Sequence, residues 1–337
     1  MSSWPGKLAR RQTVGIIGAG AMALDVHIPV LLARRDAHIA WVADVSPDAL
    51  RRARHRYGLR GCLLAGNPND LPPSDIVLLA LPVAVRGPYH EVLARRGYRV
   101  YVEKPFARTM EEALTILEAY TAGRLTCGYQ RRLYPTTDRL RKLVAESHFG
   151  RVQRIRVSEG ALTMATGMSS NFRDDPELSG GGVLIDLGSH GIDLAFQITG
   201  ASSATILSHC LVFDGGVDRD ATLQAVLTGA HEPVELLVEL SWIRDRGREF
   251  VVEFERATAR VGIGAGDLFE ISVHGSGARQ ASADETSTAS SVWTPVARAW
   301  SVLLSARDGD PLGALDPQTC LPTVSLIERA YAQARLT

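Results

Sequence analysis

The feature that most constrains the fold is a glycine turn set between a short apolar run and a helix-like stretch near the start of the chain. In "TVGIIGAGAMA", Gly18, Gly20 and Ala23 are spaced as GxGxxA. Such a turn lets a buried parallel strand pass directly into a helix, and the third position keeps helix and strand close together. The sequence therefore predicts that a doubly wound α/β domain begins at Thr13.

The pattern that follows the turn supports this fold class. Apolar runs alternate with helix-like stretches, which is typical of a parallel sheet with helices on both faces. Ser46 and Pro47 would cap and begin one helix, and Gly58 would end it. The expected strands lie at residues 13–17, 38–44, 75–82, 99–105 and 124–129.

The second part of the chain has a different character. A helix expected at 136–147 leads into strand-like runs joined by short turns, which indicate a mainly antiparallel open sheet. We therefore expect a Rossmann domain over residues 1–128 and an α+β domain over residues 129–337. A strongly apolar helix near 183–198, a polar loop over 276–291 and closing helices near 293–306 and 318–335 complete the prediction. The closing helices can pack back on the first domain. The expected strands lie at residues 151–160, 204–213, 221–229, 234–243, 248–255, 259–264 and 268–275.

Composition narrows the classes of partner. The chain has 37 basic and 37 acidic residues, and the arginines form no stripe, so we expect no nucleic-acid partner. The sequence has neither a leader-like start nor a long apolar run, which predicts a soluble cytoplasmic protein that does not insert into a membrane. The cysteines are far apart and lack metal-ligand spacing, so we expect buried, reduced thiols and no metal at Cys62, Cys127, Cys210 and Cys320.

The glycine turn and the end of the second strand together predict a dinucleotide site. Gly18 permits the tight turn, and Gly20 lets the backbone and the free N–H groups of the helix approach a pyrophosphate. Asp44 ends the second strand, where a carboxylate would accept from the ribose 2′-OH and repel a 2′-phosphate. NAD is therefore favoured over NADP, although Arg51 and Arg52 could reach a phosphate. The alternative is a glycine turn without a ligand.

A polar stripe marks the apolar helix in "GGGVLIDLGSHGIDLAFQITG". With helical spacing, Asp186, His190, Asp193 and Gln197 share one face. A helix that is apolar on its other sides is buried, so these polar groups need partners or a cleft. The alternative is that these polar groups have a structural role only and make hydrogen bonds inside the protein. The glycines at 180–182 leave the backbone bare just before this helix.

Lysine is rare in this chain. Lys104, in "YVEKPFAR", is one of three lysines, whereas arginine supplies the other positive charges. An ammonium group can shift its pKa and share a proton, whereas a guanidinium stays charged. Lys104 is either an ordinary surface lysine or a residue that takes part in proton chemistry.

Taken together, these motifs resemble the Gfo/Idh/MocA family of glucose-fructose oxidoreductases and inositol 2-dehydrogenases. The resemblance covers nearly the whole chain and rests on "VGIIGAGAMA", "VHIPVL", "VEKPFA", "GYQRRLYP", "NFRDDPELSGGGVLIDLGSHGID" and "LPTVSLIERAYAQA". It implies an NAD-dependent oxidoreductase that transfers a hydride to or from a ring hydroxyl of a sugar, inositol or aminocyclitol-type polyol. It also implies a homodimer or homotetramer built on the second sheet.

The resemblance also implies roles for individual residues. The residues expected to be catalytic are Lys104, Asp186 and His190. His190 would take the hydroxyl proton, Asp186 would orient the imidazole of His190, and Lys104 would bind the reacting oxygen. The expected cofactor contacts are Gly18, Gly20, Ala21, Met22, Asp44, Leu81, Pro82, Glu103 and Lys104. Candidates for substrate contact, which could instead form salt bridges, are Arg132, Asn171, Arg173 and Asp193.

Two positions depart from the family pattern. Many members have histidine where this chain has Arg86, so the nicotinamide end of the site can be lined differently. His190 stands where ketosugar reductases often have tyrosine, which favours alcohol oxidation. Two other activities stay open, namely an NAD-dependent glycosidase that uses transient oxidation and a non-catalytic NAD-binding regulator.

Overall fold

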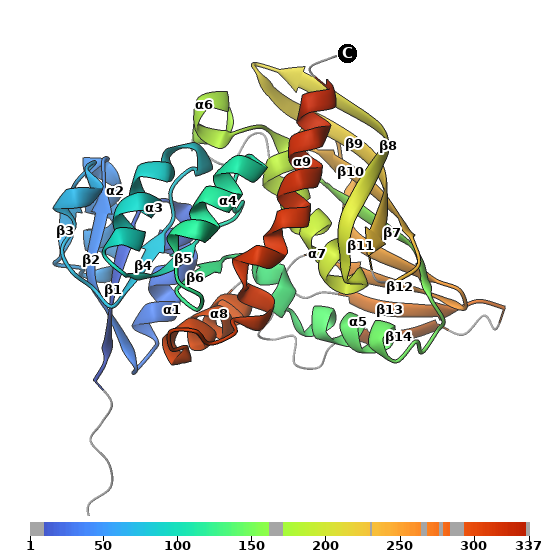
Figure 1. Cartoon of the computed structure of the whole chain (residues 1–337), viewed down its shortest axis with the longest axis horizontal. Coiled ribbons are helices and arrows are strands. Elements are labelled where there is room, and N and C mark those ends of the chain that lie inside the picture. Colours follow the sequence, from blue (N-terminus) through green and yellow to red (C-terminus); the bar gives the residue numbers. More distant parts are fainter. Residues whose placement is uncertain are drawn as a thin grey trace, which may run out of the picture.

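Two sheets organise the chain, one in each half (Figure 1). The computed structural model describes residues 10–161, 171–229, 231–263, 268–275, 279–283 and 293–334. All statements below concern these residues. The combination of a parallel first sheet and a mostly antiparallel second sheet confirms the predicted fold class.

The first sheet is parallel, with the strand order β3-β2-β1-β4-β5-β6. Its predicted strands are present, and β3 is an addition to them. The three residues of β3 are too few to show a hydrophobic period, so this edge strand could not be predicted. The strands are β1 (Gln12–Ile17), β2 (Ala37–Asp44), β3 (Cys62–Leu64), β4 (Ile76–Leu79), β5 (Arg99–Val102) and β6 (Leu125–Cys127).

The helices of the first half begin and end where local chemistry dictates. Ser46 accepts a hydrogen bond from the Ala49 N–H at 3.3 Å, Pro47 begins α2, and Gly58 ends it with a φ of 64°. These are the predicted cap, first residue and stop. The helices are η1 (Ala23–His27, one π-helical turn), α1 (Ile28–Leu32), α2 (Pro47–Tyr57), α3 (Gly87–Arg95) and α4 (Met110–Ala119), with short 3-10 turns η2 (Pro68–Asp70), η3 (Val83–Val85) and η4 (Gln130–Leu133).

The second sheet has the order β14-β13-β12-β11-β7-β10-β9-β8. Its pairs are antiparallel except for β7 and β10, which run parallel. β14 lies inside the segment predicted to be a polar loop, so that prediction was wrong for residues 279–283. The strands are β7 (Val152–Gly160), β8 (Ala201–Asp214), β9 (Val217–Gly229), β10 (Val234–Ser241), β11 (Gly247–Phe254), β12 (Ala257–Gly262), β13 (Leu268–Val273) and β14 (Arg279–Ala283).

One face of the second sheet packs against helices. Along β7, Ile155 and Val157 are buried, whereas Arg154 and Arg156 point to the other face, as the two-residue period of a strand requires. The helices α7 and α9 contact the sheet on its apolar side, and α5 packs on α7. The helical elements are α5 (Pro135–Ala145), η6 (Asn171–Arg173), α6 (Pro176–Ser179), η7 (Leu184–Gly188, one π-helical turn), α7 (Ser189–Thr199) and α9 (Leu321–Ala334).

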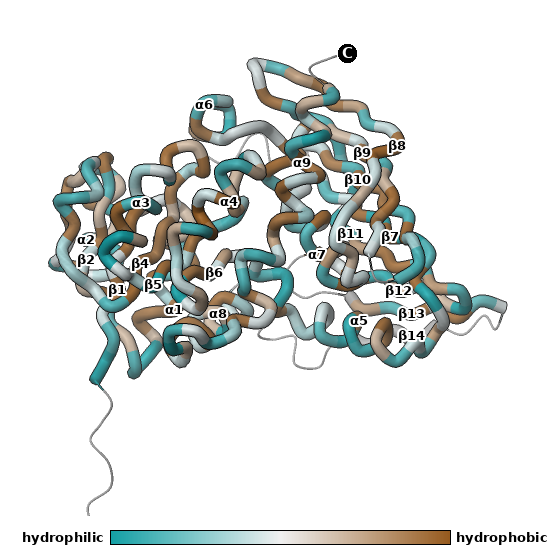
Figure 2. Tube along the Cα trace, in the orientation of Figure 1, coloured by the Kyte–Doolittle hydropathy of each residue, from teal (hydrophilic) through white to brown (hydrophobic). Residues whose placement is uncertain are grey.

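The last helices join the two halves. In α8 (Trp293–Ser305), Trp300 and Leu303 are fully buried in the same core as Val14 and Ile16 of β1. The helix α9 contacts α4 of the first half and both α7 and β8 of the second (Figure 1). Short turns η9 (Gly313–Leu315) and η10 (Pro317–Cys320) connect α8 to α9. Figure 2 shows that apolar residues concentrate along the strands of the first sheet, whereas α8 and α9 carry both apolar and polar residues.

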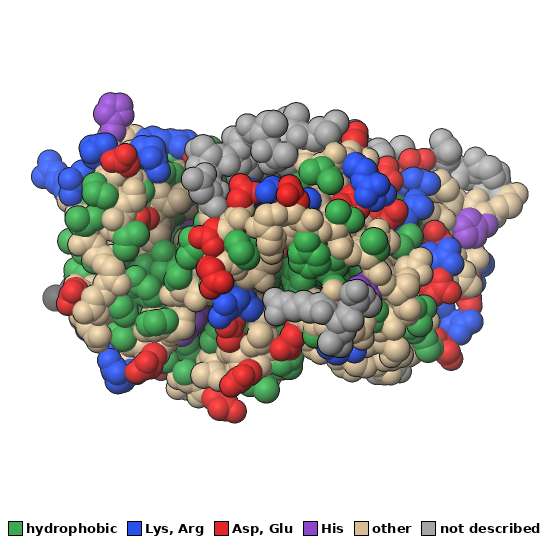
Figure 3. Space-filling model, turned by 90° about the horizontal axis from the view of Figure 1, so that it is seen from above, with side chains coloured by type: hydrophobic (Ala, Val, Ile, Leu, Met, Phe, Trp, Pro, Cys, Tyr) green, Lys and Arg blue, Asp and Glu red, His purple; other side chains and the backbone are tan. Residues whose placement is uncertain are grey.

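The surface carries charges of both signs. On the face seen in Figure 3, acidic and basic side chains are interspersed over most of the second half. Among the described residues, no helix is long and apolar enough to span a bilayer. Three cysteines are buried as predicted, but Cys210 on β8 is exposed, because its side chain points to the face that helices do not cover.

Candidate active site

The predicted cofactor residues follow the carboxyl ends of the parallel strands, where ligands bind in doubly wound sheets. Gly18 follows β1 with a φ of 94°, and a Cβ there would lie 2.4 Å from the Ala80 carbonyl oxygen. At Gly20 a Cβ would meet nothing within 4 Å, so its backbone faces open space. Ala21 is exposed, whereas Met22, Leu81 and Pro82 are half-buried near the same edge. The backbone of the glycine turn is therefore open on the side of Gly20.

Asp44 links the glycine turn to the end of β2. Its Oδ2 accepts from the Ala19 N–H at 2.7 Å, and its Oδ1 accepts from the Ser46 N–H at 2.7 Å. Each carboxylate oxygen has a second lone pair, so Asp44 keeps the capacity to accept from a ribose hydroxyl. The carboxylate therefore lies beside the glycine turn, at the end of β2.

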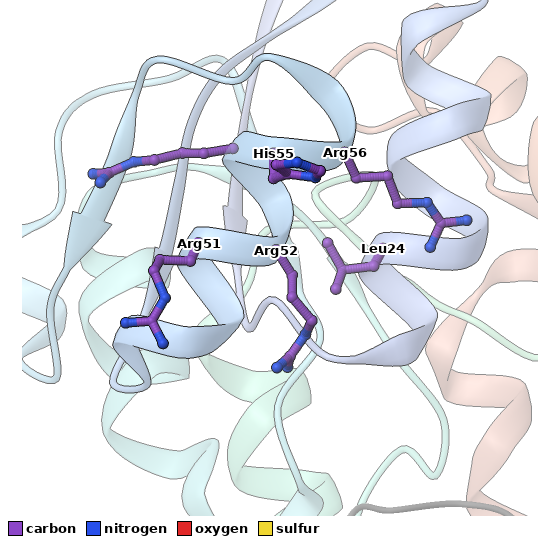
Figure 4. A pocket seen from close by; sticks show the side chains of 6 residues that line it. Leu24, Arg51, Arg52, His55 and Arg56 are labelled. Atoms are coloured by element: carbon purple, nitrogen blue, oxygen red, sulfur yellow. The ribbon is translucent and has the colours of Figure 1, made fainter.

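A group of basic side chains lies beyond Asp44 (Figure 4). They fan out from α2 and line a pocket of about 810 Å³ together with Leu24 of η1. Arg51 pairs with Asp48 at 2.5 Å, and Arg54 donates to the Cys62 carbonyl at 2.8 Å, so these two are engaged within the protein. The lining residues of this pocket are Leu24, Arg51, Arg52, Arg54, His55 and Arg56.

The segment after β5 places Lys104 at the junction of the two halves. Glu103 Oε1 lies 2.7 Å from His27 Nε2, and Trp300 Nε1 donates to His27 Nδ1 at 3.0 Å. His27 therefore donates from Nε2 to the carboxylate, whose Oε2 accepts from the Lys104 N–H at 3.2 Å. Glu103 is 5% exposed. It supports Lys104 from inside the protein, and its contact with a cofactor stays a prediction.

Lys104 and Asp186 bring the two halves together. Lys104 Nζ lies 2.7 Å from Asp186 Oδ1 and donates to the Asp186 carbonyl at 3.0 Å. Arg173 Nε lies 3.2 Å from Asp186 Oδ2. Burial acts to raise the pKa of Asp186, but the positive charges of Lys104 and Arg173 outweigh it and lower that pKa below its usual value. Asp186 is therefore an ionised carboxylate held between two cations.

His190 lies one helical turn further on and is uncharged. Burial, with help from the charges of Arg131 and Lys104, lowers the pKa of His190 well below its usual value. Its Nδ1 is buried without a hydrogen-bond partner among the described residues. The Tyr129 ring contacts the imidazole edge-on at 6.0 Å between centroids. A neutral imidazole is the form that can accept a proton.

The start of the helix that carries Asp186 and His190 is anchored to β9. Asp218 is fully buried, and its Oδ1 and Oδ2 accept from the Gly182 and Leu184 N–H groups at 2.6 and 2.7 Å. A Cβ on Gly182 would lie 2.0 Å from the Asp218 carbonyl oxygen, so only glycine permits this approach. Tyr331 of α9 donates to Asp218 at 2.7 Å. The bare backbone at 180–182 thus serves to fix the helix.

Three expectations about this site were wrong. Asp186 contacts Lys104 and Arg173, so it does not orient His190 as predicted. The reason is the π-helical turn η7, which inserts extra backbone and shifts the face on which Asp186 lies. Arg132 and Asp193, predicted to contact substrate, are 0% and 1% exposed and bind each other. They are interior residues that a substrate cannot reach.

Sequence reasoning missed Arg131, whose charge acts on His190, and its partner Glu159. Arg131 Nη2 donates to Glu159 Oε1 at 2.8 Å, and Glu159 on β7 is 1% exposed. The positive charge of Arg131 contributes to lowering the pKa of Asp186 and that of His190. A charged residue on the helix-covered face of β7 was the available signal for Glu159. The side chain of Asn171 lies outside the described part of the chain.

The fold and this site define a class of protein, an oxidoreductase with an NAD-binding Rossmann domain. Within the described residues, no group of three or more His, Cys, Asp or Glu side chains could hold a metal. Residues 12–129 match the model of an "Oxidoreductase family, NAD-binding Rossmann fold", and residues 137–260 match the "GFO/IDH/MocA C-terminal domain". The chain therefore belongs to the Gfo/Idh/MocA family.

Relatives of the chain act on sugars and polyols. It is 30% identical to a dTDP-3,4-didehydro-2,6-dideoxy-alpha-D-glucose 3-reductase of Streptomyces antibioticus over 56% of this chain and 57% of that protein. It is 31% identical to an inositol 2-dehydrogenase of Corynebacterium glutamicum over 44% of this chain and 45% of that one. Each alignment thus spans little more than half of the relative, or less.

The whole fold is similar to solved structures. A point mutant of KijD10, a 3-ketoreductase from Actinomadura kijaniata, solved with TDP-benzene and NADP, superposes with a TM-score of 0.79 at 15% identity. The match covers 96% of this chain and 98% of KijD10. Other structural neighbours hold NAD or NADH. At this identity the likeness shows the fold alone.

Proposed function

We propose that the chain is an NAD-dependent dehydrogenase that acts on a ring CH–OH group of a sugar, an inositol or an aminocyclitol-type polyol. The observation that carries the proposal is the ion pair of Lys104 with Asp186, which lies beside the uncharged His190. Oxidation of an alcohol needs a donor at the oxygen and an acceptor for its proton. These residues supply both.

The carboxyl edge of the first sheet would hold the cofactor. Gly18 and Gly20 would lie against the pyrophosphate, and Asp44 would accept from the ribose. NAD, when bound, accepts the hydride that leaves the substrate carbon. Because the Asp44 carboxylate would repel a 2′-phosphate, NAD is favoured over NADP. Ala21, Met22, Leu81 and Pro82 are proposed as further contacts with the cofactor.

The residues of the chain would handle the proton. Lys104 would donate a hydrogen bond to the substrate oxygen, and its charge favours the alkoxide that forms. His190, neutral before reaction, would take the hydroxyl proton as general base. Asp186 keeps Lys104 in place and balances its charge through the 2.7 Å contact. Arg173 and Asn171 are proposed to contact the substrate because Arg173 already lies at Asp186.

The experiment is a screen of NADH formation against inositols, aldoses, aminocyclitols and nucleotide sugars. Lys104→Met and His190→Asn should each lower kcat by about 10²- to 10⁴-fold. Lys142→Met is the matched control, because that side chain is 73% exposed and should leave turnover unchanged. Near-native turnover in either site variant would contradict the mechanism. Release of a glycoside without net NADH would identify the glycosidase activity instead.

We also propose that the second sheet forms a homodimer or homotetramer. The sheet face away from α7 and α9 carries exposed apolar side chains on β8, among them Leu207 (63%) and Val212 (43%). Burial of such a patch against a second copy removes apolar surface from water. Leu207→Glu should therefore shift the mass measured by light scattering toward 36.4 kDa. Leu114→Glu, on the exposed surface of α4 (45%), should not change this mass. A monomeric native chain would contradict the proposal.

A further inference from the structure

Arg86 is the position at which the chain departs from the family pattern, and the structure shows what its side chain does. It caps η3 just after β4 and is 3% exposed. Its guanidinium makes hydrogen bonds to four main-chain carbonyls. Nε donates to Leu81 at 2.8 Å, Nη1 donates to Glu103 and, at 2.6 Å, to Pro105, and Nη2 donates to Lys104 at 3.3 Å.

Three of these carbonyls belong to consecutive residues, and Lys104 is the middle one. A planar guanidinium with its donors in a fixed fork can hold several acceptors in one geometry, which no other side chain can do. The fourth carbonyl, that of Leu81, belongs to the neighbouring strand end. Arg86 therefore ties the segment that carries Lys104 to the loop after β4.

The charge of Arg86 persists in this enclosed place. Burial lowers the pKa of Arg86 to about 10, which still leaves the group charged at neutral pH. The Glu103 carboxylate is already bound to His27 and to the Lys104 N–H, so the carbonyl oxygens supply the direct contacts of the cation. Loss of the guanidinium would leave these buried acceptors without donors, which is unfavourable.

We propose that Arg86 is a positioning residue that fixes the backbone on both sides of Lys104, so that the ammonium group meets Asp186. The backbone of Lys104 is held by Arg86 at its carbonyl and by Glu103 at its N–H. Only the Lys104 side chain is then free to turn. It reaches the second half of the chain, where Nζ lies 2.7 Å from Asp186 Oδ1. Where the proposed function holds, the same restraint places Lys104 against the substrate oxygen.

Lysine-selective NMR tests this directly, because the chain has three lysines. With ¹³Cε-labelled lysine, the free full-length protein should give one signal for Lys104, assigned through Lys104→Arg, that is separate from the signal of the 73% exposed Lys142. Arg86→Met should move the Lys104 signal most of the way toward that of Lys142. Asp186→Asn, which removes the partner of the ammonium, should move it in the same direction.

A matched control separates positioning from general loss of stability. Leu93→Ala truncates a side chain that is 1% exposed in α3, the helix that follows Arg86. It should lower the unfolding midpoint and leave the Lys104 signal in place. An unchanged Lys104 signal in folded Arg86→Met, or an equal displacement in Leu93→Ala, would overturn the proposal. If Arg86→Met does not fold, Arg86→Gln, which keeps an amide donor, is measured against the same criteria.

Kinetics with a substrate from the screen supply a second readout. Arg86→Met should lower kcat by about 10- to 100-fold in the native background but by less than about 3-fold in a Lys104→Met background, because residues that act through one another are not additive. The affinity for NADH, measured by fluorescence, should change much less. An equal loss in both backgrounds would overturn the proposal. If Arg86→Met displaces the Lys104 signal but the screen finds no compound that is oxidised, positioning by Arg86 is supported. Only the proposed function is then contradicted.

Discussion

Removal of Asp193 tests whether the Arg132–Asp193 pair is an interior anchor. Arg132 Nε and Nη2 both donate to the Asp193 carboxylate, and Arg132 Nη1 donates to Ala314 and Thr319 at 2.9 and 2.7 Å. In Asp193→Ala the guanidinium stays enclosed and keeps only neutral partners. Loss of one member of a buried ion pair costs about 3 to 5 kcal/mol. The retained neutral acceptors place the expected loss near the lower end, at about 3 kcal/mol.

Urea unfolding followed by far-UV circular dichroism measures this loss. The double variant Arg132→Met/Asp193→Leu removes both charges, so it should recover most of the stability lost in Asp193→Ala. Asp138→Ala is the matched control on α5. Its carboxylate, 48% exposed, pairs with Arg141 and Arg298, and its loss should cost less than about 1 kcal/mol.

The outcome distinguishes an interior anchor from a substrate contact. If the pair is an interior anchor, Asp193→Ala should lower the unfolding midpoint. At a temperature where both proteins are folded, KM for any substrate should stay close to that of the native chain. Native stability combined with a KM raised tenfold or more would refute the reasoning. Asp193 would then face the substrate, and the burial of this pair would not describe the working protein.

Three further predictions follow from the charges of the site and the first sheet. Asp44→Ala should weaken NAD binding about ten- to hundredfold and narrow its advantage over NADP in calorimetric titrations, whereas an unchanged ratio would move the ribose contact elsewhere. Because the pKa of His190 lies well below its usual value, the oxidative rate should stay on a plateau as pH falls to 6.5 and should decline only at lower pH, and a limb centred at or above 6.5 would contradict this. Burial acts to raise the pKa of Asp75, but hydrogen bonds from Thr13 and Arg10 lower it from 3.8 to about 2, so its ionised form stabilises the fold by up to about 2 kcal/mol above pH 4. Asp75→Asn should lose that amount at pH 7, and the difference from the native chain should vanish as pH falls from 4 to 2; a constant difference would exclude this cause.

The fold could be predicted from local chemistry because each signal acted over a few residues. The glycine turn at Gly18, the cap at Ser46 and the alternating apolar runs each reflect a steric or hydrogen-bond preference that neighbouring residues do not override. The strand β3 and the strand β14 escaped prediction for the same reason, since neither carries an apolar period of its own. Their pairing depends on the strand already in place beside them.

The site was less predictable because it depends on where side chains turn. Arg131 and Arg132 are neighbours in one 3-10 turn, yet the first pairs with Glu159 on β7 and the second with Asp193 on α7. Identical chemistry at adjacent positions gives the sequence no means of choosing between them. The π-helical turn η7 has the same effect, since no residue type marks the extra backbone that separates Asp186 from His190.

The position of α8 in the core of the first sheet has a consequence for synthesis. Trp300 and Leu303 fill that core beside β1, but they are made long after β6 has left the ribosome. The first half must therefore leave an apolar face uncovered until α8, which follows most of the second half in the sequence, has been made. Chaperones that shield nascent chains would meet this face first, and a chain cut between the two halves would lose the helix that closes it.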